Sequence, residues 1–240
     1  MTEPTTLEPH QYAGWRATPL GAVTERLEMD LLFELAGPVR GKSVLDVGTG
    51  DGSYALEAAS RGAHVAGVDA DAAMLRAARG RADSRGLSLE LAEGRVESLP
   101  FEDDTFDVVF AVTILCFVGD AERAVQEMAR VLVPGGRLVL GELGRFNTWA
   151  AWRRVRGWLG STTWQRARFR TAREVRRTLC EAGLDVERIT GAIYYPPIRI
   201  GAQLLAPIDR FPAAVTTLGA AFLAAAARKP QHDTNQGDPS

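Results

Sequence analysis

Residues 44–52 read Val44-Leu45-Asp46-Val47-Gly48-Thr49-Gly50-Asp51-Gly52, and this stretch indicates the fold class. An apolar, β-branched run ends in three alternating glycines, and a segment with helical composition follows directly. Glycines let the backbone turn tightly and approach a ligand where a Cβ atom would clash. A strand, a glycine-rich turn and a helix in this order form the first βα unit of a nucleotide-binding sheet, with the site at the carboxyl end of the strands.

The segments that flank this stretch alternate between short β-branched runs and longer runs rich in alanine, leucine and arginine. Such alternation is typical of βα units that build a parallel sheet. We predict strands over residues 43–47, 64–68, 88–92, 106–112, 137–143 and 185–190. We predict helices over residues 53–61, 72–84, 121–132 and 171–182, the last opened by a capping box of Thr171 and Glu174.

Residues 219–227 are ambiguous, because their alanine content favours a helix. Their position just before Arg228-Lys229-Pro230 and a polar tail favours a final edge strand instead. Residues 144–170 carry four tryptophans among many arginines and resemble an inserted cap. We therefore predict an α/β, Rossmann-like, doubly wound and mostly parallel seven-stranded sheet with an antiparallel last strand and a helical cap. We expect residues 1–230 to form one domain, with a lid at 1–30 and the cap at 145–170, and residues 231–240 to form a disordered tail.

The composition narrows the class of protein. A chain of 240 residues fits one domain, and a net charge of −2 does not predict a polyanion-binding protein. The two cysteines lie far apart, which argues against a disulfide framework or a metal site and fits a reducing compartment. The first ten residues contain no apolar signal region, and the apolar stretch 213–227 is short for a bilayer helix. We expect a cytoplasmic protein without a metal.

The predicted second strand is followed by Asp69, about twenty residues after the glycines. A carboxylate at this place can accept hydrogen bonds from both ribose hydroxyls of a nucleoside. A dinucleotide site favours the spacing Gly-x-Gly-x-x-Gly, whereas this chain has Gly48-x-Gly50-x-Gly52 followed by Ser53. Asp46 and Asp51 flank the turn; they would repel a pyrophosphate and would suit the ammonium and sulfonium groups of S-adenosylmethionine.

With these motifs the sequence resembles the class I methyltransferases, in particular the small-molecule group related to the C-methyltransferases of ubiquinone and menaquinone biosynthesis. Residues 44–52 resemble the first motif of this family, and residues 65–69 resemble its second strand with the ribose-binding acid. Residues 97–107 and 127–136 resemble the segments before its fourth and fifth strands. The pattern Tyr12-x-x-Trp15-x-x-Thr18-Pro19-x-Gly21 resembles the lid that closes over the cofactor.

The resemblance implies that S-adenosyl-L-methionine is the cofactor and that Met74 packs on its adenine. The family commonly has an acid where Arg95 stands, and arginine cannot accept the hydrogen bond from the adenine amino group. Val96 can offer its backbone N–H to the ring instead, and Arg95 can stack on it. The expected cofactor-binding residues are Tyr12, Trp15, Asp46, Gly48, Gly50, Asp69, Ala70, Met74, Arg95, Val96, Thr113 and Cys116.

Methyl transfer from a sulfonium is an in-line displacement, in which the protein aligns the acceptor and excludes water. We expect a small-molecule acceptor, aromatic or quinone-like, that is methylated on carbon, oxygen or nitrogen. A base is needed only if the acceptor must lose a proton. His10, beside the lid, is a candidate, although a mobile surface histidine is the commoner case. Cys116 has no basic neighbour and is interpreted as pocket lining.

Residues 144–177 contain ten arginines and a single acid, Glu174. Three interpretations compete: a cap that packs its tryptophans on the core, an acceptor pocket, or a nucleic-acid or anionic-membrane surface. The overall charge and the lack of a nucleic-acid motif argue against nucleic acid, so we favour the first two, and membrane contact stays open. The pocket residues would be Trp149, Trp152, Tyr194 and Tyr195, and the stripe of Trp149, Trp152, Val155 and Leu159 would face away from Arg153, Arg154 and Arg156.

Two rival functions belong to other classes of protein. The first is a catalytically inactive S-adenosylmethionine-binding protein with a regulatory or assembly role, for which Arg95 is the support. The second is a nicotinamide oxidoreductase, which the glycine spacing disfavours. The sequence does not indicate an oligomeric state.

Overall fold

The computed structural model describes residues 14–198, 202, 205–206, 209–213 and 215–231. Their strands form one 7-stranded sheet in the order β3-β2-β1-β4-β5-β7-β6. β7 runs antiparallel to both of its neighbours, and the other strands are mutually parallel, so the predicted doubly wound sheet is confirmed. The strands are β1 (Ser43–Val47), β2 (His64–Asp69), β3 (Glu90–Glu93), β4 (Phe106–Val112), β5 (Leu132–Leu143), β6 (Asp185–Ala192) and β7 (Phe222–Arg228).

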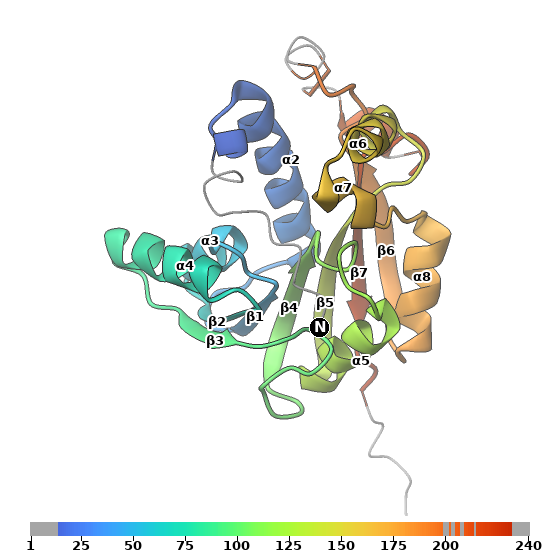
Figure 1. Ribbon diagram of the computed structural model, residues 1–240. Helices are drawn as coiled ribbons and strands as arrows, with labels where there is room; N and C mark the ends of the chain where they lie inside the picture. The colour runs from blue at the N-terminus through green and yellow to red at the C-terminus, as the bar shows by residue number, and fades with distance from the viewer. Residues whose placement is uncertain (1–13, 199–201, 203–204, 207–208, 214, 232–240) are drawn as a thin grey trace, which may run out of the picture.

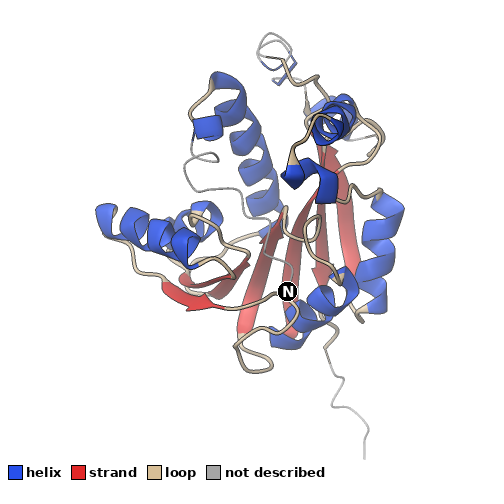
Figure 2. Cartoon of the chain, in the orientation of Figure 1, coloured by secondary structure: helices blue, strands red, loops and turns tan. Residues whose placement is uncertain are grey.

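Helices cover both faces of the sheet (Figure 1, Figure 2). α2 (Pro19–Ala36) and α3 (Ser53–Ser60) pack on one face, and α5 (Ala121–Val131) and α8 (Ala172–Glu181) pack on the other. α4 (Ala72–Ser84) lies against β2 and β3, and α10 (Arg210–Ala213) precedes β7. α6 (Thr148–Trp158) and α7 (Thr162–Arg166) form the cap. They stand across the carboxyl end of the sheet from α2 (Figure 1).

Both faces of the central strands are buried, which explains their continuous apolar sequences. In β4, Val108 and Phe110 belong to the core under α2 and α3, whereas Val109 and Ala111 belong to the core under α5 and α8. Successive side chains of a strand point to opposite faces, so a strand with helices on both sides needs apolar residues at every position.

Several predicted boundaries shift by a few residues. β2 extends to Asp69, so the expected ribose-binding acid is the last residue of the strand. β3 begins at residue 90 instead of 88, and α5 ends at residue 131. β5 begins at residue 132 instead of 137, so Pro134-Gly135-Gly136 lies within the strand, and the register with β4 shifts between Phe106 and Val108. α4 has the predicted bounds.

The prediction that the last strand lies at the edge of the sheet is wrong. β7 lies between β5 and β6, and its residues 222–227 are all buried. The alanine-rich sequence has a physical explanation here, because β7 is covered by α2 on one side and by α8 on the other. Small side chains leave room for both helices to approach the strand.

The predicted orientation of the cap helix is also wrong. Trp149 is 3% exposed, but Trp152 is 43% and Leu159 is 81% exposed, so the predicted stripe faces outward beyond Trp149. The buried face of α6 carries Trp149 together with Ala150 and Gly157, and a Cβ atom at Gly157 would come within 3.2 Å of the Trp164 backbone. The arginines do not turn away from the aromatic residues. Arg153 lies over Trp149 and Trp164, Arg154 over Phe169, and Arg156 over Trp152.

None of the helices among the described residues combines the length and apolar composition that a bilayer crossing requires.

Candidate active site at the carboxyl end of the sheet

The glycine loop after β1 is fixed to the end of β2. The amide groups of Gly48 and Thr49 both donate to the Val68 carbonyl oxygen, at 2.8 and 3.0 Å. Gly48 and Gly50 have left-handed backbones, with φ of +68° and +56°. A Cβ atom at Gly48 would lie 2.8 Å from Ile114 Cδ1, whereas nothing lies within 4 Å of the same position at Gly50. The loop therefore packs on the chain beyond β4 and leaves its outer side open to a ligand.

Asp69 braces this loop from the neighbouring strand. Its Oδ2 accepts a hydrogen bond from the Gly50 amide at 2.8 Å, and its Oδ1 accepts one from the Asp71 amide at 2.9 Å. Partial burial raises the pKa of Asp69. A carboxylate offers about four lone pairs, so each oxygen retains one for a further donor. This geometry fits a ribose, whose two adjacent hydroxyls would donate to the two oxygens.

The two acids that flank the loop already have partners. Asp46 is buried and accepts hydrogen bonds from Thr49 Oγ1 at 2.7 Å and from the Ala55 amide at 3.1 Å. Burial raises its pKa to about 6. Asp51, which was expected to suit the positive groups of the cofactor, forms ion pairs with Arg81 at 2.8 Å and with Arg16. Its charge is compensated inside the protein.

The residues expected near the adenine follow β2 and β3. Met74 is buried at the start of α4, and Ala70 is exposed. The side chain of Arg95 is 71% exposed and forms an ion pair with Glu97 at 3.3 Å. The side chain of Val96 is part of the core between the sheet, α5 and α8. Arg95 thus points to solvent.

The chain beyond β4 forms the rim of the site. Thr113 has a left-handed backbone with φ of +51°, rare for a residue other than glycine, and its amide donates to the Gly141 carbonyl at 2.7 Å. Cys116 is fully buried, and its Sγ donates to the Thr113 carbonyl at 3.2 Å. Burial raises the pKa of this thiol well above its ordinary value, so Cys116 stays neutral and lines the rim.

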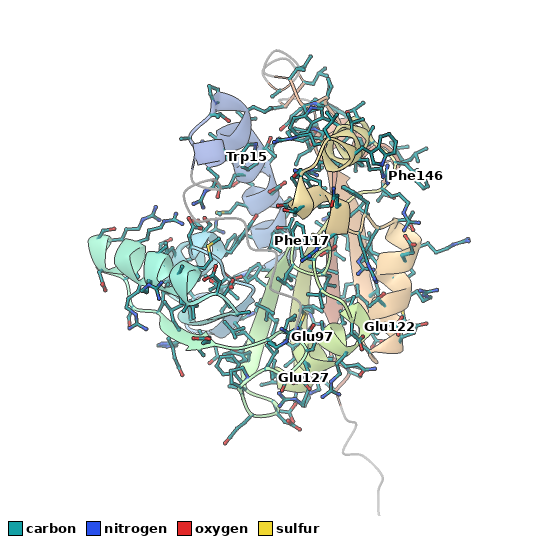
Figure 3. All side chains as sticks on the ribbon, in the orientation of Figure 1. Trp15, Glu97, Phe117, Glu122, Glu127 and Phe146 are labelled. Atoms are coloured by element: carbon teal, nitrogen blue, oxygen red, sulfur yellow. The ribbon has the colours of Figure 1, made fainter. Side chains whose placement is uncertain are left out.

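α2, whose first residues fall within the predicted lid, is tied to the glycine loop by a residue that was not expected at the site. Arg16 binds Ser53 and Asp51 of the loop and reaches Glu25 of α2 at 3.2 Å. Trp15 is half-buried beside it and packs on the core under α2 (Figure 3). His10 and Tyr12, the other lid residues predicted to act here, lie outside the described residues.

Replacing Arg16 by alanine should loosen the lid. Asp51 would retain Arg81, so we expect a loss of about 1–2 kcal/mol rather than the larger loss of an unpaired buried charge. Amide hydrogen exchange over residues 19–36 should accelerate by about tenfold. The control is Arg26→Ala on α2, because Arg26 is exposed and its ion pair with Asp30 is long, at 4.0 Å. Equal exchange in the two variants would show that Arg16 does not hold the lid.

The residues predicted to line the acceptor pocket do not lie together. Trp149 and Tyr195 are adjacent, since Trp149 Nε1 donates to the Tyr195 carbonyl at 2.8 Å, and both are buried in the core under α2. Tyr194 packs on the opposite core and donates to the Thr216 carbonyl. Trp152 lies on the exposed side of α6. In Figure 3, Phe117 projects near the centre of the carboxyl end, between Trp15 and Phe146.

Sequence reasoning missed four charged residues around this end of the sheet. Glu28 and Glu142 are buried, and Arg153 and Arg170 approach them from the cap and from the segment that follows it. For Glu142 the available signal was one acid inside an otherwise apolar run, LVLGEL, whereas Glu28 lies among further acids in LEMDLLFELA and had no such signal. Buried charges are rare unless they are paired or used, so such positions indicate a site.

Comparisons with known proteins agree with this geometry. Residues 45–140 match the model of the methyltransferase domain family. Over 174 residues the chain is 31% identical to a ubiquinone biosynthesis O-methyltransferase of Maricaulis maris, covering 68% of each chain. Over 119 residues it is 41% identical to a demethylmenaquinone methyltransferase of Thermus thermophilus, covering 49% of this chain and 52% of that one.

A solved structure from Thermotoga maritima, described as an S-adenosylmethionine-dependent methyltransferase and possible histamine N-methyltransferase, has the same fold. It is 21% identical, with a TM-score of 0.68 over 92% of this chain and 95% of that one. The residues matched by the family model include the glycine loop, Asp69 and the rim beyond β4. The chain belongs to the class I S-adenosylmethionine-dependent methyltransferases, and S-adenosylmethionine is its cofactor.

Proposed function

We propose that this methyltransferase acts on a small aromatic or quinone-like acceptor that binds between the glycine loop and the cap. The observation that carries the proposal is the aromatic lining of the cap beside the rim. Cys116 packs with Phe169, and the rings of Phe117 and Trp164 lie 6.4 Å apart on the same cluster. The names of two relatives, which include ubiquinone and menaquinone, support an acceptor of this kind.

Asp69, Gly50 and Met74 are the residues that would hold the nucleoside part of S-adenosylmethionine, which supplies its methyl group from a sulfonium centre. The remaining work of the chain is to align the acceptor and to exclude water. The buried pair of Trp149 and Tyr195 gives the cap a rigid base, and the aromatic cluster at Phe117 gives an acceptor ring a surface for stacking.

The alternative of a catalytically inactive S-adenosylmethionine-binding protein gains no support. It depended on Arg95, whose side chain points to solvent and pairs with Glu97.

A screen of acceptors tests the proposal. The protein is incubated with S-adenosylmethionine and with separate panels of hydroquinones, phenols, arylamines and aliphatic amines, and mass spectrometry detects products that carry one added methyl group. We expect methylation within the aromatic panels and none with the Asp69→Ala variant. Turnover confined to aliphatic acceptors would contradict the proposal.

A further inference from the structure

Glu28 is a buried acid on the lid helix to which the proposed function assigns no role. It is 9% exposed and lies one helical turn after Thr24, whose hydroxyl forms a hydrogen bond of 3.0 Å with Tyr195 Oη. The described residues offer the Glu28 carboxyl group no hydrogen bond and no direct ion pair. Acids are rarely buried to this extent unless they are paired or used, so Glu28 is a candidate for a functional group.

Arg153 faces Glu28 from the cap. Its guanidinium lies over the rings of Trp149 and Trp164, at 5.3 and 4.9 Å from their centroids. Its positive charge lowers the pKa of Glu28 and also that of Cys116, so it lies within electrostatic reach of both groups. α2 and the cap thus bring a carboxyl group and a guanidinium towards each other at the carboxyl end of the sheet.

The helix that carries Glu28 also contacts the end of the glycine loop, and Arg153 lies within electrostatic reach of Cys116 at the rim. On the lid, Glu25 binds Arg16, and Arg16 binds Ser53 at the end of the glycine loop. At the rim, Cys116 donates a hydrogen bond to the Thr113 carbonyl. Ile114, which follows Thr113 in the chain, packs against Gly48. α2 and α6 stand on opposite sides of this end of the sheet (Figure 1), and Phe117 projects between them (Figure 3).

We propose that Glu28 accepts the proton of an acceptor hydroxyl and that Arg153 stabilises the oxygen anion formed, so that the acceptor is a phenol or an enol rather than an amine. This inference rests on the proposed function and specifies the acceptor of that same site.

With a phenol, methyl transfer and loss of the hydroxyl proton proceed together. The acceptor oxygen forms a bond to the methyl carbon as the carbon–sulfur bond breaks, and the electron pair of that bond stays on sulfur. The hydroxyl proton passes to the Glu28 carboxylate and then to water. A positioned cation stabilises negative charge that develops on the oxygen. An amine would instead become an ammonium ion on methylation, which the positive charge of Arg153 disfavours.

The titration of Glu28 matches this role. Burial raises its pKa to about 8, with Arg153 lowering it and Glu25 on the same helix raising it further. Tyr195 is the other titratable group that faces it, and burial raises the pKa of that phenol to about 12, so Tyr195 stays neutral. A general base works best when its pKa lies near the working pH. The rate with a phenol should therefore rise with pH up to about 8.

The Glu28→Gln variant tests the base directly. We expect kcat for a phenol to fall by about 100-fold to 10,000-fold and its rise towards pH 8 to disappear, while S-adenosylhomocysteine binds within about twofold of the normal affinity. Glu28→Asp should recover part of the rate, because it keeps a carboxylate. The control is Glu34→Gln on the same helix, whose side chain is exposed and pairs with Arg188.

A binding measurement gives a readout without turnover. 4-Nitrophenol is added to the protein with S-adenosylhomocysteine below the pKa of the free probe, and the phenolate absorbance of the bound fraction is recorded. We expect a strong phenolate band in the unaltered protein and in Glu28→Gln, because Glu28 with its raised pKa is protonated at this pH and glutamine resembles the protonated carboxyl group. We expect a weaker band in Arg153→Gln, which lacks the cation. Equal bands in the unaltered protein and Arg153→Gln, or full activity of Glu28→Gln on phenols, would overturn the inference.

The outcomes separate the two proposals. Methylation of arylamines but not of phenols would overturn the role of Glu28 and Arg153 and leave an aromatic acceptor in place. Failure of every aromatic panel would contradict the proposed function itself.

Discussion

Replacing Asp69 by alanine is expected to weaken S-adenosylhomocysteine binding by roughly 100-fold or more. The two carboxylate oxygens would accept two charge-assisted hydrogen bonds from the ribose, each worth about 1.5–3 kcal/mol, and tenfold in affinity corresponds to about 1.4 kcal/mol. The alanine also removes the acceptor for the Gly50 amide, so the glycine loop loses its brace to β2. Isothermal titration calorimetry with S-adenosylmethionine and S-adenosylhomocysteine measures the effect.

Asp71→Asn is the matched control for this experiment. Asp71 carries the same charge two residues away and caps α4 by accepting a hydrogen bond from the Ala73 amide at 2.8 Å. Asparagine caps a helix as well as aspartate does, so this variant removes a charge without disturbing the helix. We expect it to change the binding free energy by less than about 1 kcal/mol. Similar losses in the two variants would indicate a general charge effect and would argue against a ribose contact at Asp69.

The sequence predicts the central sheet well, because the evidence for it is local. A β-branched run, a glycine turn and a helix in register define each βα unit, and right-handed connections then leave few arrangements. Asp69 follows from this logic, since the end of a strand and the loop of its neighbour meet at one edge of the sheet. The capping box of Thr171 and Glu174 is equally local and is present in α8.

The errors arise where a segment's environment is set by distant parts of the chain. An alanine-rich strand is compatible with an edge or a central position, and only the packing of α2 and α8 on β7 distinguishes them. On α6, hydrophobic spacing suggested a buried stripe, but Gly157 and Ala150 permit closer packing than tryptophan does. Beyond Trp149, the buried face of that helix is therefore set by small residues.

The polar interior of the site is the part least accessible from sequence. The partners of Asp51 are Arg16 and Arg81, 35 and 30 residues away from it, and no local pattern links them. Likewise, Glu127 resembles an ordinary helix residue within a family motif. In the structure it accepts a hydrogen bond from the Leu99 amide at 3.0 Å and pairs with Arg130, which fixes the segment before β4.

Replacing Arg170 by methionine is expected to destabilise the protein by about 3–5 kcal/mol at high pH, because it leaves the buried Glu142 carboxylate without its cation. Glu142 is fully buried near the end of β5, and Arg170 Nε lies 3.6 Å from its Oε2. Both side chains also hold the rim. The Leu115 amide donates to Glu142 Oε1, and Arg170 Nη2 donates to the Leu115 carbonyl, each at 3.2 Å. Urea unfolding at several pH values measures the loss.

The dependence on pH identifies Glu142 as the origin of this effect. Burial raises the pKa of Glu142 from the ordinary 4.5 to about 8, although Arg170 lowers it. Between these two pH values the folded protein holds a proton on Glu142 that the unfolded chain has released. The stability of the unaltered protein should accordingly fall as the pH rises from 4.5 to about 8 and should then level off. Arg170→Met removes the positive charge that lowers the pKa of Glu142. Below neutral pH Glu142 is protonated in the variant and no buried charge is left unpaired. The difference in the free energy of unfolding between the variant and the unaltered protein should therefore shrink there.

The double variant Glu142→Gln, Arg170→Met tests whether Arg170 stabilises the protein through Glu142. A glutamine oxygen still accepts from the Leu115 amide, and no buried charge remains, so most of the lost stability should return. Glu142→Gln should also reduce the decline in stability with pH. It should not abolish that decline, because burial raises the pKa of Glu28 and of Asp46 in the same direction. A double variant as unstable as Arg170→Met, at every pH, would mean that Arg170 acts through its hold on the rim rather than through Glu142.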